Sequence, residues 1–178
     1  TLAYVTKLFG FDGDVNRINT ARFVCMRRSS DISLERGFVP SPTVIPHDVE
    51  RFGTHHAREA HYVYRTMGVD LAVRPSVVLI PTQHMHTLRF SPDMKRPLDV
   101  AQATERTYNS RLCGRTDKQQ AAQVLAFARD HGYRGRIFSR LVVPTPGLSC
   151  VDNHLDGFCF EPDSTELLST LAAIIWFL

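Results

Sequence analysis

The segment from residue 149 to residue 168 contains the residue types that are best suited to chemistry. Two cysteines, Cys150 and Cys159, bracket a polar stretch, and Glu166 stands just before an apolar C-terminal run. A carboxylate that is held in place stabilises positive charge developing on a reacting ligand. The same residues also suit an acidic loop that caps a helix beginning at Leu167, and spacing alone favours that interpretation.

A pair of arginines could bind the anionic part of a ligand. Arg27 and Arg28 follow the apolar, β-forming segment 21–26, which we expect to be a buried strand. Burial of an arginine is costly unless the guanidinium is paired, so one of the two should reach an anion or a polar pocket. The guanidinium plane suits the phosphates of a nucleotide. A solvated loop that contains both arginines is an equally good interpretation of their types.

Five histidines form another set of candidate ligands. His55, His56 and His61 lie on or beside a predicted helix. His84 and His86 would project from the same face of a predicted strand. Together they could hold the metal of a metal-dependent hydrolase. The sequence has no H-E-x-x-H motif, and hydrogen-bonded or solvated histidines are the favoured interpretation.

The elements that would position these residues alternate between helices and short strands. Apolar spacing, capping residues and β-forming runs predict helices at 51–67, 98–106 and 116–131, and strands at 21–26, 77–80, 82–90 and 136–143. The segments 39–46 and 91–97 are predicted loops, and 1–11 has no clear pattern. Because no repeat or linker divides the sequence, we expect one α+β domain over residues 1–178.

Composition narrows the class of protein. The 178 residues are 43% hydrophobic and 22% charged with a net charge of +3, which is typical of a globular domain and does not favour nucleic-acid binding. The longest apolar run is shorter than the roughly 20 residues of a membrane span, and no signal-peptide pattern opens the sequence. The four cysteines are small buried residues or, in a secreted protein, include a disulfide between Cys150 and Cys159.

Several short motifs together resemble a known enzyme family. The motifs are an arginine strand with a following turn at 23–29 and 35–38, an aromatic-x-serine segment at 107–110, a helix and strand at 121–143, and the segments 150–157 and 162–169. In order and spacing they resemble the cholera-toxin-like branch of the mono-ADP-ribosyltransferases. The resemblance covers about residues 22–38 and 107–175 and leaves residues 39–106 without a counterpart.

The resemblance implies a fold and a set of roles. It implies an ADP-ribosyltransferase-like fold, in which two small antiparallel sheets and flanking helices surround an NAD cleft. Arg27, or Arg28 as second choice, would hold NAD, and Ser110 would brace the pocket. Glu166 would stabilise the ribose cation as nicotinamide leaves. Ser164 stands two positions earlier, where members that modify arginine have a second glutamate.

The resemblance also implies a function. The protein would cleave the nicotinamide–ribose bond of NAD and transfer ADP-ribose to a host macromolecule, most readily a protein. It would be a virulence toxin or an effector that is secreted or delivered into a host cell. Ser164 replaces a glutamate, which leaves three alternatives. The protein could use a different acceptor, hydrolyse NAD alone, or act as a binding protein without turnover.

Overall fold

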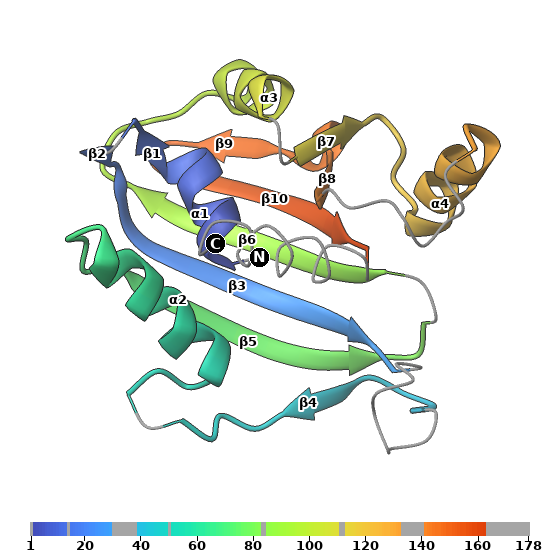
Figure 1. The fold of residues 1–178 in the computed structure, drawn as a ribbon, viewed down its shortest axis with the longest axis horizontal. Coiled ribbons are helices and arrows are strands. Elements are labelled where there is room, and N and C mark those ends of the chain that lie inside the picture. Colours follow the sequence, from blue (N-terminus) through green and yellow to red (C-terminus); the bar gives the residue numbers. More distant parts are fainter. Residues whose placement is uncertain are drawn as a thin grey trace, which may run out of the picture.

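A computed structural model of the chain describes residues 2–13, 15–29, 39–49, 51–82, 85–110, 113–132 and 141–162. Helices and strands alternate along these residues, and most strands join one large sheet (Figure 1). In chain order the elements are α1 (Leu2–Gly10), β1 (Phe11–Asp12), β2 (Val15–Asn16), β3 (Ile18–Arg28), β4 (Thr43–Ile45), α2 (His55–Thr66), β5 (Ala72–Ile80), β6 (His86–Met94), α3 (Val100–Asn109), β7 (Cys113–Thr116), α4 (Ala121–Asp130), β8 (Leu141–Pro144), the 3-10 turn η1 (Thr145–Gly147), β9 (Ser149–Val151) and β10 (His154–Glu161).

The large sheet contains eight strands of the described part of the chain, in the order β4-β5-β3-β6-β10-β8-β7, and β9 pairs with β10. It is a mixed sheet, because β3 pairs with β5 and β7 pairs with β8 in parallel, while the other pairs are antiparallel. The expected fold of two small antiparallel sheets is therefore wrong. Helix α2 lies between β3 and β5 in the chain and allows these two strands to pair in parallel within one sheet.

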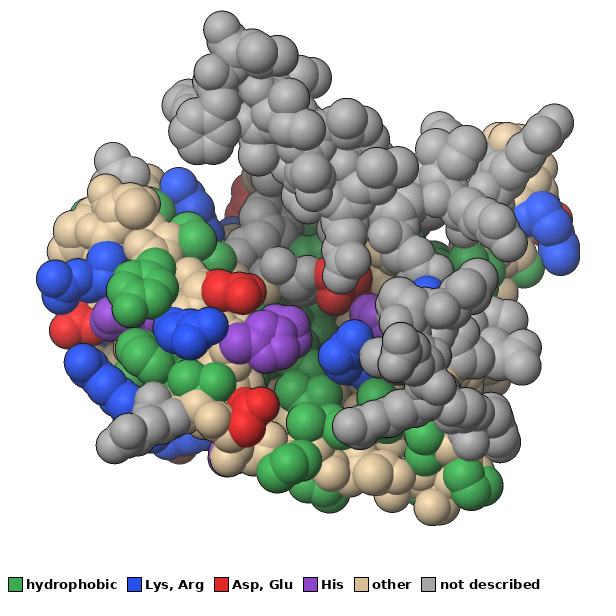
Figure 2. All heavy atoms as spheres, turned by 60° about the horizontal axis from the view of Figure 1, so that its bottom comes forward, with side chains coloured by type: hydrophobic (Ala, Val, Ile, Leu, Met, Phe, Trp, Pro, Cys, Tyr) green, Lys and Arg blue, Asp and Glu red, His purple; other side chains and the backbone are tan. Residues whose placement is uncertain are grey.

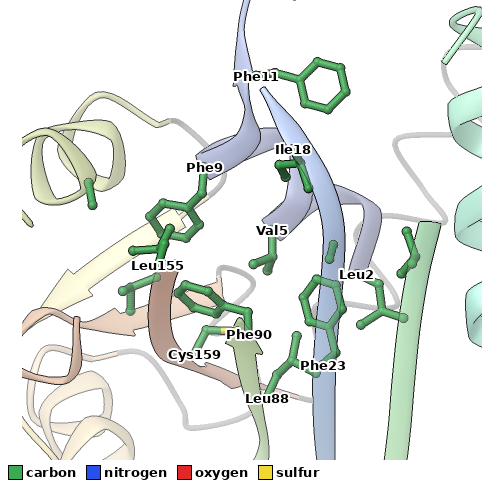
Figure 3. Packing of buried hydrophobic residues seen from close by; sticks show 14 of the residues in the cluster. Leu2, Val5, Phe9, Phe11, Ile18, Phe23, Leu88, Phe90, Leu155 and Cys159 are labelled. Atoms are coloured by element: carbon green, nitrogen blue, oxygen red, sulfur yellow. The ribbon is translucent and has the colours of Figure 1, made fainter. Parts of the chain in front are cut away.

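One side of this sheet, called the core face below, carries the main hydrophobic core. Residues at every second position of each strand point to it, as alternation in a strand requires. Figure 3 shows the result, with strand side chains of β3, β6 and β10 packed against side chains of α1. The buried residues include Phe23 of β3, Phe90 of β6, Leu155 of β10, and Val5 and Phe9 of α1.

The opposite face of the same strands carries ion pairs. Asp93 of β6 accepts hydrogen bonds from Arg22 of β3 at 2.6 Å and lies 2.7 Å from Nδ1 of His154. Arg89 of β6 pairs with Asp156 of β10. Charged side chains on one face and buried apolar side chains on the other are the pattern of an antiparallel sheet with one side in water.

Helix α2 confirms the helix that the sequence predicts at 51–67. The Thr54 side chain accepts a hydrogen bond from the backbone N–H of Ala57 at 3.3 Å and caps its beginning. Gly68 follows its end with a φ of 72°, which glycine adopts without strain. Ala60 and Tyr64 are buried in the core and fix this helix over the core face.

Other expectations need correction. Helix α1 forms at 2–10, where the sequence showed no clear pattern, because Val5 and Phe9 pack into the core. Strand β4 lies inside the predicted loop 39–46, and β6 extends through most of the predicted loop 91–97. Helix α4 begins at Ala121 and not at residue 116. No helix in the described ranges is long and apolar enough to span a membrane.

The polar segment after Cys150 is also different from the expectation. Residues 149–161 form the hairpin of β9 and β10, in which Cys150 pairs with Leu155. All four cysteines of the chain are free, so Cys150 and Cys159 do not form a disulfide in this structure.

Gly157 of β10 provides a test of this packing. A Cβ atom at this position would lie 2.4 Å from a ring carbon of Phe90 and 2.8 Å from a methyl carbon of Leu148. We expect Gly157→Ala to lower the free energy of unfolding by about 1–3 kcal/mol, because the buried side chains must move. Chemical denaturation measures the change.

Gly147 is the matched control for that variant. A Cβ atom there would meet only Phe158, at the ordinary contact distance of 3.5 Å. Gly147→Ala should therefore change stability less than Gly157→Ala. Equal stability of the two variants would contradict the packing described here.

Candidate functional site

Three ionisable residues lie side by side on neighbouring strands at one end of the core face. His86 of β6 pairs with Glu161 of β10, and β3 and β6 pair through Met26 and Thr87, so the next position brings Arg27 opposite His86. We call Arg27, His86 and Glu161 the polar row. All three are half-buried, and the two strand spacings between Arg27 and Glu161 correspond to about 10 Å.

The polar row adjoins apolar side chains on two sides. One step back along the strands, the same face carries Cys25, Leu88 and Cys159, which are paired across β3, β6 and β10. Leu79 of β5 pairs with Arg27. Leu88, Cys159 and Leu79 are buried and Cys25 packs against the core. Charged groups beside such a floor interact strongly with a ligand, because the local dielectric is low.

The first turn of α2 contributes further groups to this region. The rings of His55 and His56 lie with their centroids 3.9 Å apart, and Nδ1 of His56 is 4.0 Å from Glu59. Burial lowers the pKa of His56 below its ordinary value; the nearby His55 and Arg27 lower it too, whereas Glu59 and Glu161 raise it. His56 therefore lies within electrostatic range of both charged members of the polar row. Figure 2 shows histidines beside side chains of both charges on one face of the molecule.

Two thiols beside the polar row, Cys25 and Cys159, and the more distant Cys150 have raised pKa values. Burial and the neighbouring Glu161 raise the pKa of Cys25 to about 12, against a smaller opposite effect of Arg27. Burial raises the pKa of Cys159 well above its ordinary value, and Glu161 adds to the effect. Burial, followed by Asp99, also raises the pKa of Cys150. The thiolate is the reactive form of cysteine, so burial lowers the reactive fraction of these thiols at neutral pH.

The polar row can bind an anion and donate a hydrogen bond. Arg27 offers a guanidinium to a carboxylate or phosphate. Nδ1 of His86 accepts a hydrogen bond from the backbone N–H of Arg28 at 3.2 Å. In the neutral ring the proton is then on Nε2, which can donate to a ligand oxygen.

The structure separates the residues that the resemblance groups around NAD. Arg27 lies on the core face in the polar row, whereas Arg28, as the next residue of β3, points to the opposite face. Ser110 is the C-cap of α3, just before β7. Four strand spacings, about 19 Å, separate β7 from β3, so Ser110 is not part of the polar row. Ser164 and Glu166 lie outside the described residues.

The described histidines do not all gather around one point. His61 lies 3.6 Å from Asp70 and contacts the ring of Phe52, while His86 belongs to the polar row. His84 lies outside the described residues. Within the described ranges, no group of three or more metal-ligating side chains could hold a metal ion. The metal-dependent hydrolase therefore gains no support from this part of the chain.

Glu161 was not identified as a site residue in the sequence analysis. The signal was present in the alternation of Leu155, Gly157, Cys159 and Glu161, which places a carboxylate at the end of a buried strand face. The connection between His86 and Glu161 needed the strand register, which no local pattern contains.

Comparisons with known proteins connect this fold with a dehydrogenase. A crystal structure of aspartate semialdehyde dehydrogenase II from Vibrio cholerae matches 92% of this chain and 55% of its own, at 10% sequence identity and a TM-score of 0.61. The same enzyme complexed with ASA matches 83% of this chain and 50% of its own, at 10% identity and a TM-score of 0.54. The likeness at this identity shows the fold alone, and this chain spans about half the length of those proteins.

These similarities again contradict an ADP-ribosyltransferase-like fold and give the chain a fold found in a dehydrogenase. No protein-family model matches the sequence, and no curated protein matches it either. The sequence-based resemblance to a toxin family stays a prediction.

The charges around His56 provide a test of the site's geometry. Arg27 lowers the pKa of His56 and Glu161 raises it. We therefore expect Arg27→Gln to raise this pKa and Glu161→Gln to lower it. A pH titration of the His56 ring proton by NMR measures both shifts.

Arg22 is the control, because it lies on β3 with an exposed side chain on the opposite face. Arg22→Gln should leave the pKa of His56 unchanged. If Arg22→Gln and Arg27→Gln shifted it equally, the first turn of α2 would not face the polar row.

Proposed function

We propose that this chain is the substrate-binding part of a dehydrogenase that acts on a small aldehyde bearing an anionic group. The observation that carries the proposal is the polar row of Arg27, His86 and Glu161 on the core face. The fold likeness to aspartate semialdehyde dehydrogenase II, over 92% of this chain, supports the reaction class.

Each member of the polar row has a role in this proposal. Arg27 binds the carboxylate or phosphate of the substrate, because its guanidinium is half-buried beside apolar residues. His86 donates from Nε2 to the aldehyde oxygen and polarises the carbonyl group. Glu161 sits opposite His86 and balances the positive charge of Arg27 when no substrate is bound.

Two further groups that aldehyde oxidation requires would come from outside the described residues. The first is a nucleophile, because the thiols of Cys25, Cys150 and Cys159 have raised pKa values. The second is a hydride acceptor, for which we propose NAD or a related dinucleotide. The sequence contains no G-x-G-x-x-G turn, which is the usual sequence signature of a dinucleotide phosphate site. In this proposal the polar row binds the substrate.

ADP-ribosyl transfer is the second candidate function. The observation that favours it is an arginine and a carboxylate, Arg27 and Glu161, at the same end of the core face. That reaction needs a cation for the phosphates of NAD and a carboxylate for the ribose cation. The sequence-based resemblance gives the catalytic role to Glu166, which lies outside the described residues, and Glu161 is the carboxylate that the described residues place near Arg27. A host protein would be the acceptor, and the protein would act as a secreted toxin or effector. A binding protein without turnover is the inactive form of this candidate.

Binding of an anionic aldehyde tests the first candidate. We expect succinic semialdehyde to bind the chain in a calorimetric titration, and Arg27→Gln to weaken the binding about tenfold or more, because a charge-assisted contact is lost. Arg22→Gln should leave the affinity unchanged, since Arg22 lies on the opposite face of the same strand.

Butanal is the matched ligand, because it has a similar chain without the carboxylate. The wild type should bind butanal more weakly than succinic semialdehyde. The Arg27→Gln variant should bind the two aldehydes with equal affinity. Equal binding of both aldehydes to the wild type would remove Arg27 from the proposed role.

Release of nicotinamide from NAD tests the second candidate. The wild type should release nicotinamide if the chain is an ADP-ribosyltransferase or an NAD glycohydrolase, and Glu166→Gln should reduce the rate a hundredfold or more, on the order of the loss of one electrostatic group. Release that is unaffected by Glu166→Gln would exclude the assigned role of this residue.

A further inference from the structure

A pocket of about 370 Å³ lies between α4, the end of β7 and β8. Its walls include Val142 of β8 and Val124 and Phe127 of α4. Val142 packs with Phe160 in a small second cluster, whereas its neighbours Leu141 and Val143 belong to the main core. The pocket is therefore on the side of the sheet opposite to the polar row.

The inner part of this pocket is apolar. Val124 and Val142 are almost completely buried, with exposed fractions of 4% and 2%. Phe127 is 53% exposed although it lines the same pocket, and its ring contacts the His131 ring in a tilted arrangement with centroids 4.1 Å apart. A flat apolar molecule that covered this ring would remove a large hydrophobic side chain from water.

The outer part of the pocket is polar and carries a positive charge excess. Arg115, Lys118 and Asp117 line it, which gives two cations and one carboxylate. The Arg115 guanidinium lies 4.5 Å from the ring centroid of Tyr108, and Lys118 is 3.7 Å from Asp117. Because a single carboxylate faces two cations, an anion can be added here without like-charge repulsion.

Two further features favour an anion at this edge. The backbone N–H of Lys118 donates to the Thr116 hydroxyl at 3.0 Å, so the residue that carries the ammonium group is held in place. Helix α4 begins three residues after Lys118 with no acidic residue in its first turn and no side-chain cap on Gln120. The positive end of its dipole is therefore not neutralised by its own side chains.

We propose that this pocket binds a small molecule with a flat apolar body and one anionic group, of the aromatic carboxylate class. The apolar body lies against Phe127 and over Val124 and Val142, and the anionic group pairs with Lys118. The volume of 370 Å³ is at the small end of the range for ligand pockets, roughly 300–1,000 Å³. The site is separate from the polar row and independent of the proposed function.

A fluorine NMR titration with para-trifluoromethylbenzoate tests this site. The wild type should bind the probe at millimolar concentrations or below. Lys118→Gln should weaken the binding about threefold to tenfold, since one charge-assisted contact is lost. Phe127→Ser should weaken it by at least as much, because the apolar platform is removed. Both side chains are exposed, and unchanged circular dichroism confirms that the variants fold.

Tyr62→Ser is the matched control, because Tyr62 is an aromatic residue of α2 with 60% of its surface exposed. This variant should bind the probe as the wild type does. The amide of the same probe has no charge and should bind the wild type more weakly. Absence of binding at millimolar probe, equal loss in Tyr62→Ser, or equal binding of amide and carboxylate would each overturn the proposal.

Discussion

The structure depends on the pairing register of β3, β6 and β10. Because side chains alternate between the faces of a strand, a slip by one residue would turn Phe23, Phe90 or Leu155 out of the core. The same slip would separate the polar row, since Arg27, His86 and Glu161 meet only in the observed register. The hydrophobic core thus fixes the geometry of the site. Hydrophobic burial stabilises this register, and the register in turn determines where the ionisable groups at the strand ends lie.

The position of these groups at the strand ends limits the cost of their burial. Charges in the middle of the core face would lose their hydration, whereas Arg27 and Glu161 are half-buried and of opposite sign. The effect of low polarity is visible one step further in, where the pKa of Cys25 rises to about 12. A ligand anion at Arg27 would meet a charge that is only partly screened by water. The core thus provides both the position of the polar row and the local dielectric that strengthens its interactions.

Local signals predicted local structure and failed for long-range pairing. The glycine at position 68 and the apolar spacing before it predicted α2, and the β-forming run at 21–26 predicted the centre of β3. Helix α1 also ends on a glycine, Gly10, but the sequence before it was not recognised as a helix, and its formation follows from the packing of Val5 and Phe9. The parallel pairing of β3 with β5 joins residues about fifty positions apart, and no pattern in either strand specifies it. Short motifs in the right order therefore suggested a two-sheet fold that the strand pairing excludes.

The low identity to the dehydrogenase shows what this fold requires of a sequence. At 10% sequence identity, 92% of this chain still matches that structure with a TM-score of 0.61. Alternation along β3, β6 and β10 places apolar side chains on the core face, and a fold by itself does not determine the residues of its functional site. Those end positions are therefore free to change with function. In this chain they hold a cation, an imidazole and a carboxylate at one level of the sheet. The proposed function depends on that combination, because the alternation of apolar side chains along the strands does not require ionisable groups at these positions.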